Sequence, residues 1–322
     1  ARPVAVPAVA AASRRPQSVP VAAGAADRVA GRLRPAAFAN AAVTASAALA
    51  WTGGADAVLD ERSLSAIQSF MRPGDVAASG AYAGSVRDGI GDALAKFPCS
   101  RMQAAFRPET GGLEIRGHVP DEGLRVEVVS MLTETVGGSI PVGGSLIVLP
   151  EPQCGVLGRV EAMGLPQSSD QTDDPLVVGR EAQVATRRLE DGSPLVLALQ
   201  APDFDAHVYI DYFDGGGKVY HLLPNESATD NVFAADAPFS IGDGKLGITA
   251  TIAPPFGQDL AVVFGSSHPL YEGARPLDED ADDYLAWLYA RIAELARTEP
   301  GFRGEWVYQL VITGPRGAFA PG

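Results

Sequence analysis

A glycine-rich turn between two apolar runs is the feature that most constrains the fold of this chain. The run AHVYIDYF (206–213) is followed by Asp214-Gly215-Gly216-Gly217 and then by KVYHLL (218–223). Two β-type runs on either side of a short glycine turn predict an antiparallel hairpin. Further strands are expected at 194–200, 246–252, 259–265 and 306–313, and one helix at 281–298. Many strands with one late helix predict a β-sandwich-like domain with one added helix.

A smaller domain is predicted before this hairpin. A first helix, capped by Asp60, places Leu64, Ile67 and Phe70 at helical spacing. The elements expected after it alternate between helix and strand: a helix at 86–97, strands at 101–107 and 112–119, a helix at 121–136 and a strand at 146–149. This order predicts a small two-layer αββαβ domain, so the fold class of the whole chain is α+β.

Composition sets the expected domain boundaries. Residues 1–56 are rich in Ala, Pro and Arg without helical or strand periodicity, and predict a disordered tail or linker. The remaining expected segments are a helical lead-in with the α/β domain (57–150), a polar connector (151–176), the sandwich-like domain (177–314) and a free end (315–322).

Charge and hydropathy restrict the partners of this chain. The formal net charge of −14 over 322 residues makes nucleic acid an unexpected partner. Residues 1–40 hold six arginines and one aspartate, a basic segment that is either solvated or close to an anionic membrane surface. No apolar run reaches the roughly 18–20 residues that span a bilayer. The chain begins with Ala, so we expect that a leader has been removed or that a longer protein precedes it.

The two cysteines, Cys99 and Cys154, lie at opposite edges of the predicted small domain. Two cysteines are too few for a zinc site of cysteines alone. A disulfide between them would close a loop of roughly 55 residues and favours the periplasm or the cell exterior. The alternative is a pair of buried free thiols in a reducing compartment.

Histidines and acidic residues offer little catalytic chemistry. His207 and His221 flank the hairpin and would bind a metal with Asp205 or Asp211, but a hydrogen-bonded cross-strand pair is the simpler interpretation. The chain lacks HExxH, GxSxG and phosphate-binding glycine motifs, and Gly265-Ser266-Ser267-His268 lacks the setting of a nucleophile. The acidic run 278–283 suits a helix start and lacks EF-hand spacing. We therefore expect no enzyme activity, no metal and no cofactor.

The hairpin and the Pro254–Gln258 turn form the candidate recognition edge. This candidate interaction surface consists of His207, Tyr209, Asp211, Tyr220, His221 and Phe256. Aromatic residues are enriched at binding surfaces, although core packing is the competing explanation for most of them.

Ten blocks of sequence resemble a known bacterial family. They are LDERSLSAIQSFMRPGD, FPCSRMQ, LEIRGHVPDEG, LPEPQCG, GLPQSSDQ, APDFDAHVYIDYFD, HLLPN, APPFGQDLAVVF, PLYEG and GFRGEWVY. From about Leu59 to Thr313 the chain resembles the non-kinase C-terminal region of alphaproteobacterial membrane serine/threonine protein kinases. Residues 86–150 are similar to a BON-like domain, and residues 177–313 resemble an uncharacterised domain found after bacterial kinases and caspase-like proteases.

The resemblance implies an extracytoplasmic sensory, regulatory or protein-interaction region, tethered to the inner membrane in the full-length protein. It supplies no catalytic residues, because the kinase Gly-rich loop, VAIK, HRD and DFG motifs are not in this chain. The expected partner is a protein or an envelope component. The alternative is a structural component of a cell-surface or envelope assembly, and a hydrolase whose site the sequence does not reveal is a third hypothesis.

Overall fold

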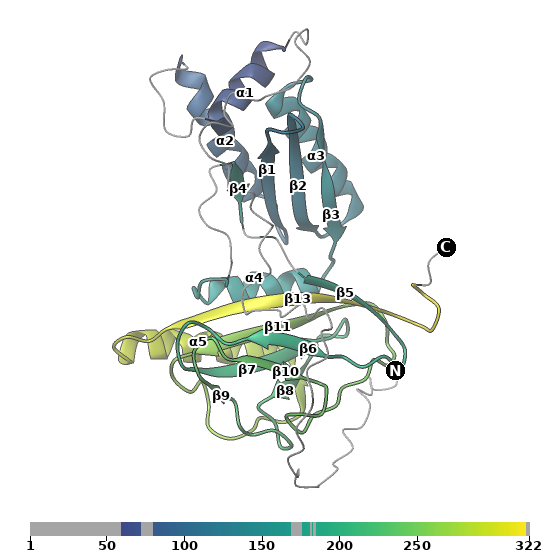
Figure 1. Ribbon diagram of the computed structural model, residues 1–322, viewed down its shortest axis with the longest axis vertical. Helices are drawn as coiled ribbons and strands as arrows, with labels where there is room; N and C mark the ends of the chain where they lie inside the picture. Colours follow the sequence, from purple (N-terminus) through teal and green to yellow (C-terminus); the bar gives the residue numbers. More distant parts are fainter. Residues whose placement is uncertain (1–58, 72–79, 169–175, 181, 183–184, 320–322) are drawn as a thin grey trace, which may run out of the picture. The chain divides into compact units, whose positions relative to one another are not determined.

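The computed structural model describes residues 59–71, 80–168, 176–180, 182 and 185–319 (Figure 1). The chain divides into two compact units, and the division falls within helix α4 (Gln153–Ala162). We call them the N-terminal unit (59–155 with 176–182) and the C-terminal unit (156–168 with 185–319). The predicted tail, residues 1–56, lies outside the described residues. Among the described residues, no helix is long and apolar enough to cross a membrane.

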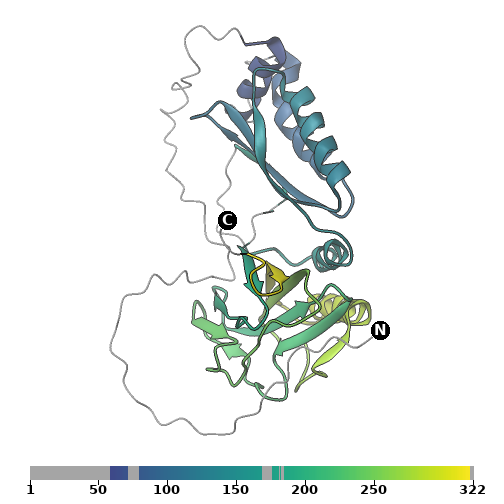
Figure 2. The same cartoon turned by 90° about the vertical axis from the view of Figure 1, so that its right-hand side faces the viewer.

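The N-terminal unit is a four-stranded sheet with helices on one face (Figure 2). The strand order is β3-β2-β1-β4, in which β1 is antiparallel to β2 and β4, and β2 is parallel to β3. Its elements are α1 (Glu61–Met71), α2 (Gly80–Leu94), β1 (Arg101–Arg107), β2 (Gly112–Val119), α3 (Glu122–Val136), β3 (Val142–Val148) and β4 (Val177–Gly179). The predicted αββαβ order is found in α2 to β3.

Capping residues determine where the helices of this unit begin and end. The Asp121 side chain accepts a hydrogen bond from the Leu124 N–H at 2.8 Å and starts α3, and Gly137, with φ of 89°, ends it. Asp60 likewise accepts from the Ser63 N–H at 3.0 Å and starts α1. The predicted apolar face of α1 is partly wrong, because Leu64 is 46% exposed. The helix instead buries Ser63, Ala66, Ser69 and Phe70.

Strand β4 corrects a predicted boundary. The sequence predicts that the second domain starts at residue 177, but β4 pairs with β1 through Gln103↔Gly179 and Ala105↔Val177. The segment therefore completes the sheet of the N-terminal unit. Conversely, the expected connector contains α4, whose larger part belongs to the C-terminal unit.

The C-terminal unit contains a seven-stranded sheet of order β12-β8-β7-β11-β13-β5, with β9 also paired to β7 (Figure 1). A separate two-stranded sheet pairs β10 with β6. The elements are β5 (Ala185–Glu190), β6 (Leu197–Gln200), β7 (Ala206–Phe213), β8 (Lys218–Leu223), β9 (Val232–Phe233), β10 (Pro238–Ile241), β11 (Gln258–Ser266), β12 (Asp278–Asp280), α5 (Ala281–Thr298) and β13 (Gly304–Gly314).

The central strands of the large sheet are buried on both faces. On one face, Val208, Ile210 and Val263 join the core that includes Leu197 and Leu199 of the small sheet. The opposite face meets α5, which buries Tyr284, Leu285, Leu288, Ile292 and Leu295. Two sheets and one added helix confirm the α+β, sandwich-like fold class. The strand expected at 246–252 is wrong, since that segment makes only isolated bridges such as Pro194↔Thr251.

Candidate functional site

The turn of the β7–β8 hairpin is fixed by one aspartate. Asp214 Oδ1 accepts hydrogen bonds from the Gly216 N–H at 2.9 Å and from the Lys218 N–H at 2.8 Å. Gly217 has φ of 83°, a conformation that glycine adopts without steric cost. The predicted hairpin is confirmed, and its register brings Asp211 opposite His221.

A buried polar network crosses this hairpin. The His221 Nδ1 lies 2.7 Å from Asp211 Oδ1, and its Nε2 lies 2.8 Å from Glu279 Oε1. The Tyr284 hydroxyl donates to Asp211 Oδ2 at 2.6 Å. Arg275 donates two hydrogen bonds to the Glu279 carboxylate, at 2.5 and 2.8 Å. We call this chain, from Tyr284 through Asp211, His221 and Glu279 to Arg275, the histidine network.

The pKa values of His221, Glu279 and Tyr284 are shifted in directions that agree with the hydrogen bonds of the histidine network. Burial by itself lowers the pKa of His221, but the charge and hydrogen bond of Asp211 and then Glu279 outweigh it, so the pKa is raised. The hydrogen bond from Arg275 lowers the pKa of Glu279. Burial, followed by the charge of Asp211, holds the pKa of Tyr284 well above its ordinary value. With His221 protonated, the two carboxylates are balanced by two cations.

The histidine network joins several elements of the C-terminal unit, and its centre is buried. The side chains of Asp211 and His221 have zero exposure, and Tyr284 is also fully buried. Only Glu279 and Arg275, each 20% exposed, reach the surface. The network therefore connects β7, β8, β12 and α5, and its two central groups, Asp211 and His221, are shielded from solvent.

Most of the candidate interaction surface lies inside the fold. Tyr209, Asp211, Tyr220 and His221 are all buried, so their expected exposure is wrong. The reason is that β7 and β8 are covered on both faces by α5 and by the small sheet. The hydroxyl groups have internal roles: Tyr209 accepts from the Leu270 N–H at 2.8 Å, and Tyr220 donates to Asp214 Oδ2 at 3.3 Å.

The remaining two residues of that surface are half-buried. Phe256 packs against the core of the C-terminal unit. His207 pairs in register with Val232 of β9 and with Ser266 of β11. The cross-strand pair of His207 with His221 is therefore wrong, and the actual neighbour of His221 is Asp211.

Asp259 forms a second buried cluster that was not predicted from the sequence. Its carboxylate accepts from the Tyr212 hydroxyl at 2.7 Å and from the Gly215 N–H at 3.1 Å. Burial raises the pKa of Asp259 to about 6 despite these hydrogen bonds. The sequence signal that could have revealed this cluster is an aspartate on the core-facing side of a predicted strand.

The N-terminal unit buries one histidine without a hydrogen-bond partner. His118 on β2 is 4% exposed, and among the described residues neither of its ring nitrogens has a partner. Burial first, and then the charge of Arg101, lowers the pKa of His118 to about 4. Arg101 lies directly opposite on β1. The imidazole is therefore neutral at physiological pH.

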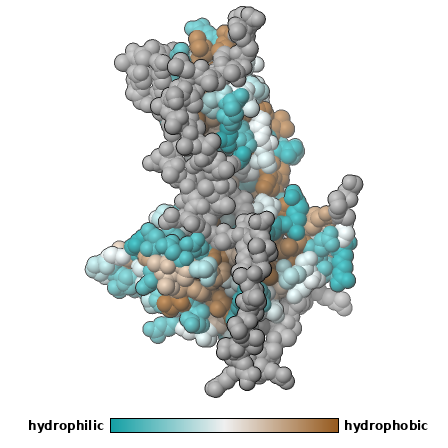
Figure 3. All heavy atoms as spheres, viewed as in Figure 1, coloured by the Kyte–Doolittle hydropathy of each residue, from teal (hydrophilic) through white to brown (hydrophobic). Residues whose placement is uncertain are grey.

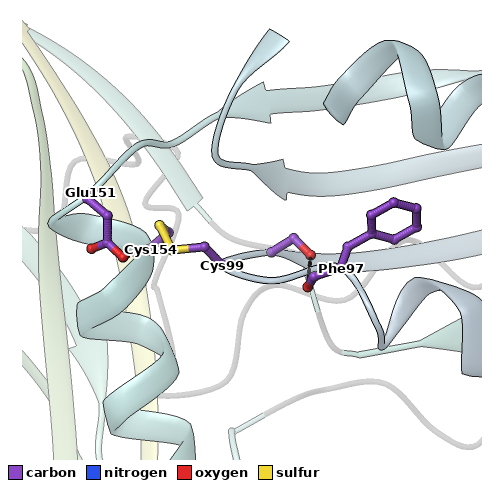
Figure 4. Close-up of a disulfide and its surroundings, with 5 residues drawn as sticks. Phe97, Cys99, Glu151 and Cys154 are labelled. Atoms are coloured by element: carbon purple, nitrogen blue, oxygen red, sulfur yellow. Dashed lines mark hydrogen bonds between the residues drawn. A yellow bond between two sulfur atoms is a disulfide. The ribbon is translucent and has the colours of Figure 1, made fainter. Parts of the chain in front are cut away.

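The predicted disulfide between Cys99 and Cys154 is confirmed (Figure 4). The two Cα atoms lie 5.1 Å apart across a sequence separation of 55. The Glu151 carboxylate points toward the sulfurs, and its Oε1 lies 3.1 Å from Cys99 Sγ. Closing a loop of this length stabilises the folded chain by about 4 kcal/mol in the chain-entropy treatment.

A groove of ligand size lies on the surface of the C-terminal unit. It has a volume of about 430 Å³ and runs beside α5, where Phe204, Ile292, Phe302 and Arg303 contribute to its lining. Arg303 lies over the Phe204 ring at 4.3 Å and pairs with Asp203 at 2.6 Å. On the face drawn in Figure 3, hydrophilic residues surround small hydrophobic areas.

Fold and site together define an α+β chain with a disulfide-closed α/β unit and a sandwich-like unit that contains a buried polar network. Residues 189–269 match the family described as Domain of unknown function (DUF4384). The match runs from the end of β5 to just beyond β11 and includes the hairpin. The searches of curated proteins and of solved structures each gave no match.

Proposed function

We propose that this chain is a non-catalytic, extracytoplasmic region of a bacterial envelope protein that binds another protein or an envelope component. The observation that carries the proposal is the disulfide between Cys99 and Cys154. Disulfides that persist in folded proteins are typical of the periplasm and the cell surface, because cytosolic reductants keep thiols reduced.

Two further observations support a binding role over a catalytic one. The strongest acid–base constellation, Asp211 with His221, has zero exposure and is saturated by Tyr284 and Glu279. Its hydrogen bonds tie strands and helix together, which is the behaviour of a structural network. The groove beside α5 has an apolar wall and a charged rim at Arg303, a combination found at contact surfaces.

The finer proposal concerns the parent protein. The αββαβ order of α2 to β3 supports the resemblance to a BON-like module. The match of residues 189–269 to an uncharacterised domain supports the resemblance to the β-rich domain found after bacterial kinases. We therefore assign the chain to a sensory or regulatory region associated with a membrane serine/threonine kinase. Sequencing the reading frame upstream of Ala1 tests this assignment directly, and a frame without a kinase domain contradicts it.

Localisation is tested in the source cells. Spheroplasts are treated with an external protease, while a thiol-reactive polyethylene glycol reports the state of Cys99 and Cys154. We expect the region to be digested from outside and both cysteines to resist labelling until a reductant is added. A protected region with two labelled thiols would exclude the extracytoplasmic proposal.

A structural assembly component is the second candidate, and strand β3 favours it. This strand lies at the end of the sheet order, and its residues Gly143, Gly144 and Ser145 are exposed. An exposed edge strand is a template for pairing with another chain. Light scattering coupled to size-exclusion chromatography separates the candidates, because an assembly component gives a mass that rises with concentration and a monomeric sensor does not.

A further inference from the structure

We propose that Cys99, Glu151 and Cys154 form a redox-controlled site for a thiophilic divalent cation such as Zn²⁺. The oxidised chain closes the site as a disulfide, and the reduced chain opens it. One ligand atom from each of the three side chains lies within 4.8 Å of the other two. This is the only such group of three or more among the residues described by the structure.

The donors come from two segments of the N-terminal unit that are distant in sequence. Cys99 follows helix α2, Glu151 precedes α4, and Cys154 lies in the first turn of α4. Two thiolates and a carboxylate are donors that Zn²⁺ binds, and a water molecule would complete a tetrahedron. The site therefore needs no further protein donor, only a water molecule.

The contact between Glu151 and the sulfur requires an explanation that the disulfide does not provide. A disulfide sulfur carries no hydrogen, so the 3.1 Å approach of Glu151 Oε1 to Cys99 Sγ is not a hydrogen bond. A carboxylate oxygen that lies within 4.8 Å of both sulfurs is placed as a metal ligand would be.

The three ligand side chains differ in their exposure to solvent. Cys154 is 2% exposed, whereas Cys99 is half-buried and Glu151 is exposed. A cation can therefore enter from the side of Glu151 and meet the buried sulfur last.

The redox step needs an external dithiol. The dithiol breaks the bond between the two sulfurs, supplies two electrons and two protons, and leaves as its own disulfide. The protein then carries two thiols. Binding of the cation releases both thiol protons to solvent and places two thiolates and the Glu151 carboxylate on the metal.

Cobalt(II) titration of the full chain tests the site. The protein is reduced with dithiothreitol, freed of reductant without oxygen, and titrated with Co²⁺. We expect one equivalent to bind with thiolate-to-cobalt absorption in the reduced protein and none in the oxidised protein. Glu151→Gln should weaken binding roughly tenfold or more. Glu127→Gln, at an exposed carboxylate on α3, is the matched control and should bind as the wild type does.

Thiol alkylation gives a second readout if reduction unfolds the unit. In that case metal binding is coupled to folding, and the cation should restore helical circular dichroism while protecting both thiols. Equal Co²⁺ affinity of Glu151→Gln and Glu127→Gln would overturn the role of Glu151. Rapid alkylation of both thiols in the presence of one equivalent of Zn²⁺ would overturn the site altogether.

Discussion

Acidification offers a direct measure of the burial of His118. The folded pKa of this imidazole is about 4, whereas the ordinary value is 6.5. As the pH falls below about 6.5, protons bind the unfolded chain and not the folded one. The free energy of unfolding therefore decreases between about pH 6.5 and about pH 4. The displacement of about 2.5 pKa units corresponds to about 3 kcal/mol.

Replacement of the imidazole isolates this contribution. His118→Gln does not titrate, so its stability should fall less steeply with acid than that of the wild type. Other groups titrate in both proteins, so their contributions cancel in the difference. Glu114 is an example: burial raises its pKa, but the hydrogen bonds from Arg116 and Arg107 outweigh burial and lower it. The comparison of slopes also removes any cost of burying the glutamine amide.

Urea unfolding read by pulsed hydrogen exchange and mass spectrometry suits this test, because peptides of β1 and β2 report the N-terminal unit separately. The loss between about pH 7 and about pH 4 should be about 3 kcal/mol larger in the wild type than in His118→Gln. A difference below about 1 kcal/mol would refute the reasoning, since it would correspond to less than one pKa unit. The C-terminal unit should show the same acid dependence in both proteins.

Three further predictions concern stability. Tyr284→Phe removes the hydroxyl that donates to Asp211, and should cost the C-terminal unit about 1.5–3 kcal/mol in urea unfolding, the range for hydrogen bonds to charged groups. A cost near zero would mean that the buried carboxylate finds another donor. Gly144→Ala should cost the N-terminal unit about 2 kcal/mol or more, because Gly144 has φ of 136° and a Cβ there would overlap the Ile115 carbonyl oxygen. Gly143→Ala, with nothing within 4 Å, should be nearly neutral, and equal costs would contradict this account. Replacing both disulfide cysteines with serine should lower the free energy of unfolding by about 4 kcal/mol, and an unchanged thermal midpoint would show that the cross-link contributes nothing.

Some features of the fold could be predicted because short stretches of sequence determine them. The hairpin follows from the glycines after Asp214, and α3 begins where Asp121 caps it. The disulfide follows from the positions of two cysteines at the edges of one small domain. Each of these features depends on residues that are close in sequence, or on the simple pairing of the two cysteines.

Burial on the hairpin was not predictable from alternation. Strand β7 is buried at seven of its eight positions, so polar and aromatic residues on it carry no sign of which face meets solvent. The partners of its polar residues are also remote. Glu279 lies 58 residues from His221, and Tyr284 lies 73 residues from Asp211. Because the hairpin alone does not specify these partners, its polar residues looked like an exposed surface.

Strand β5 was missed for a different reason. Its sequence, ATRRLE, has a low apolar content and no alternation that marks a strand. It forms because β13 offers a parallel partner, with Leu310 opposite Thr186 and Ile312 opposite Arg188. Strand β13 is itself strongly apolar and buried, so the tertiary partner overrides the weak local preference.

The acidic run at residues 278–280 explains how one edge of the large sheet ends. Asp278 pairs with Lys218 at 2.7 Å, Glu279 points inward to His221, and Asp280 accepts from the Asp282 N–H at 2.9 Å to start α5. Each carboxylate therefore has its own partner. A short edge strand with inward and flanking charges resists pairing with another chain. Strand β3 has exposed glycines and no such charges, so the pairing proposed for an assembly component would form at this edge.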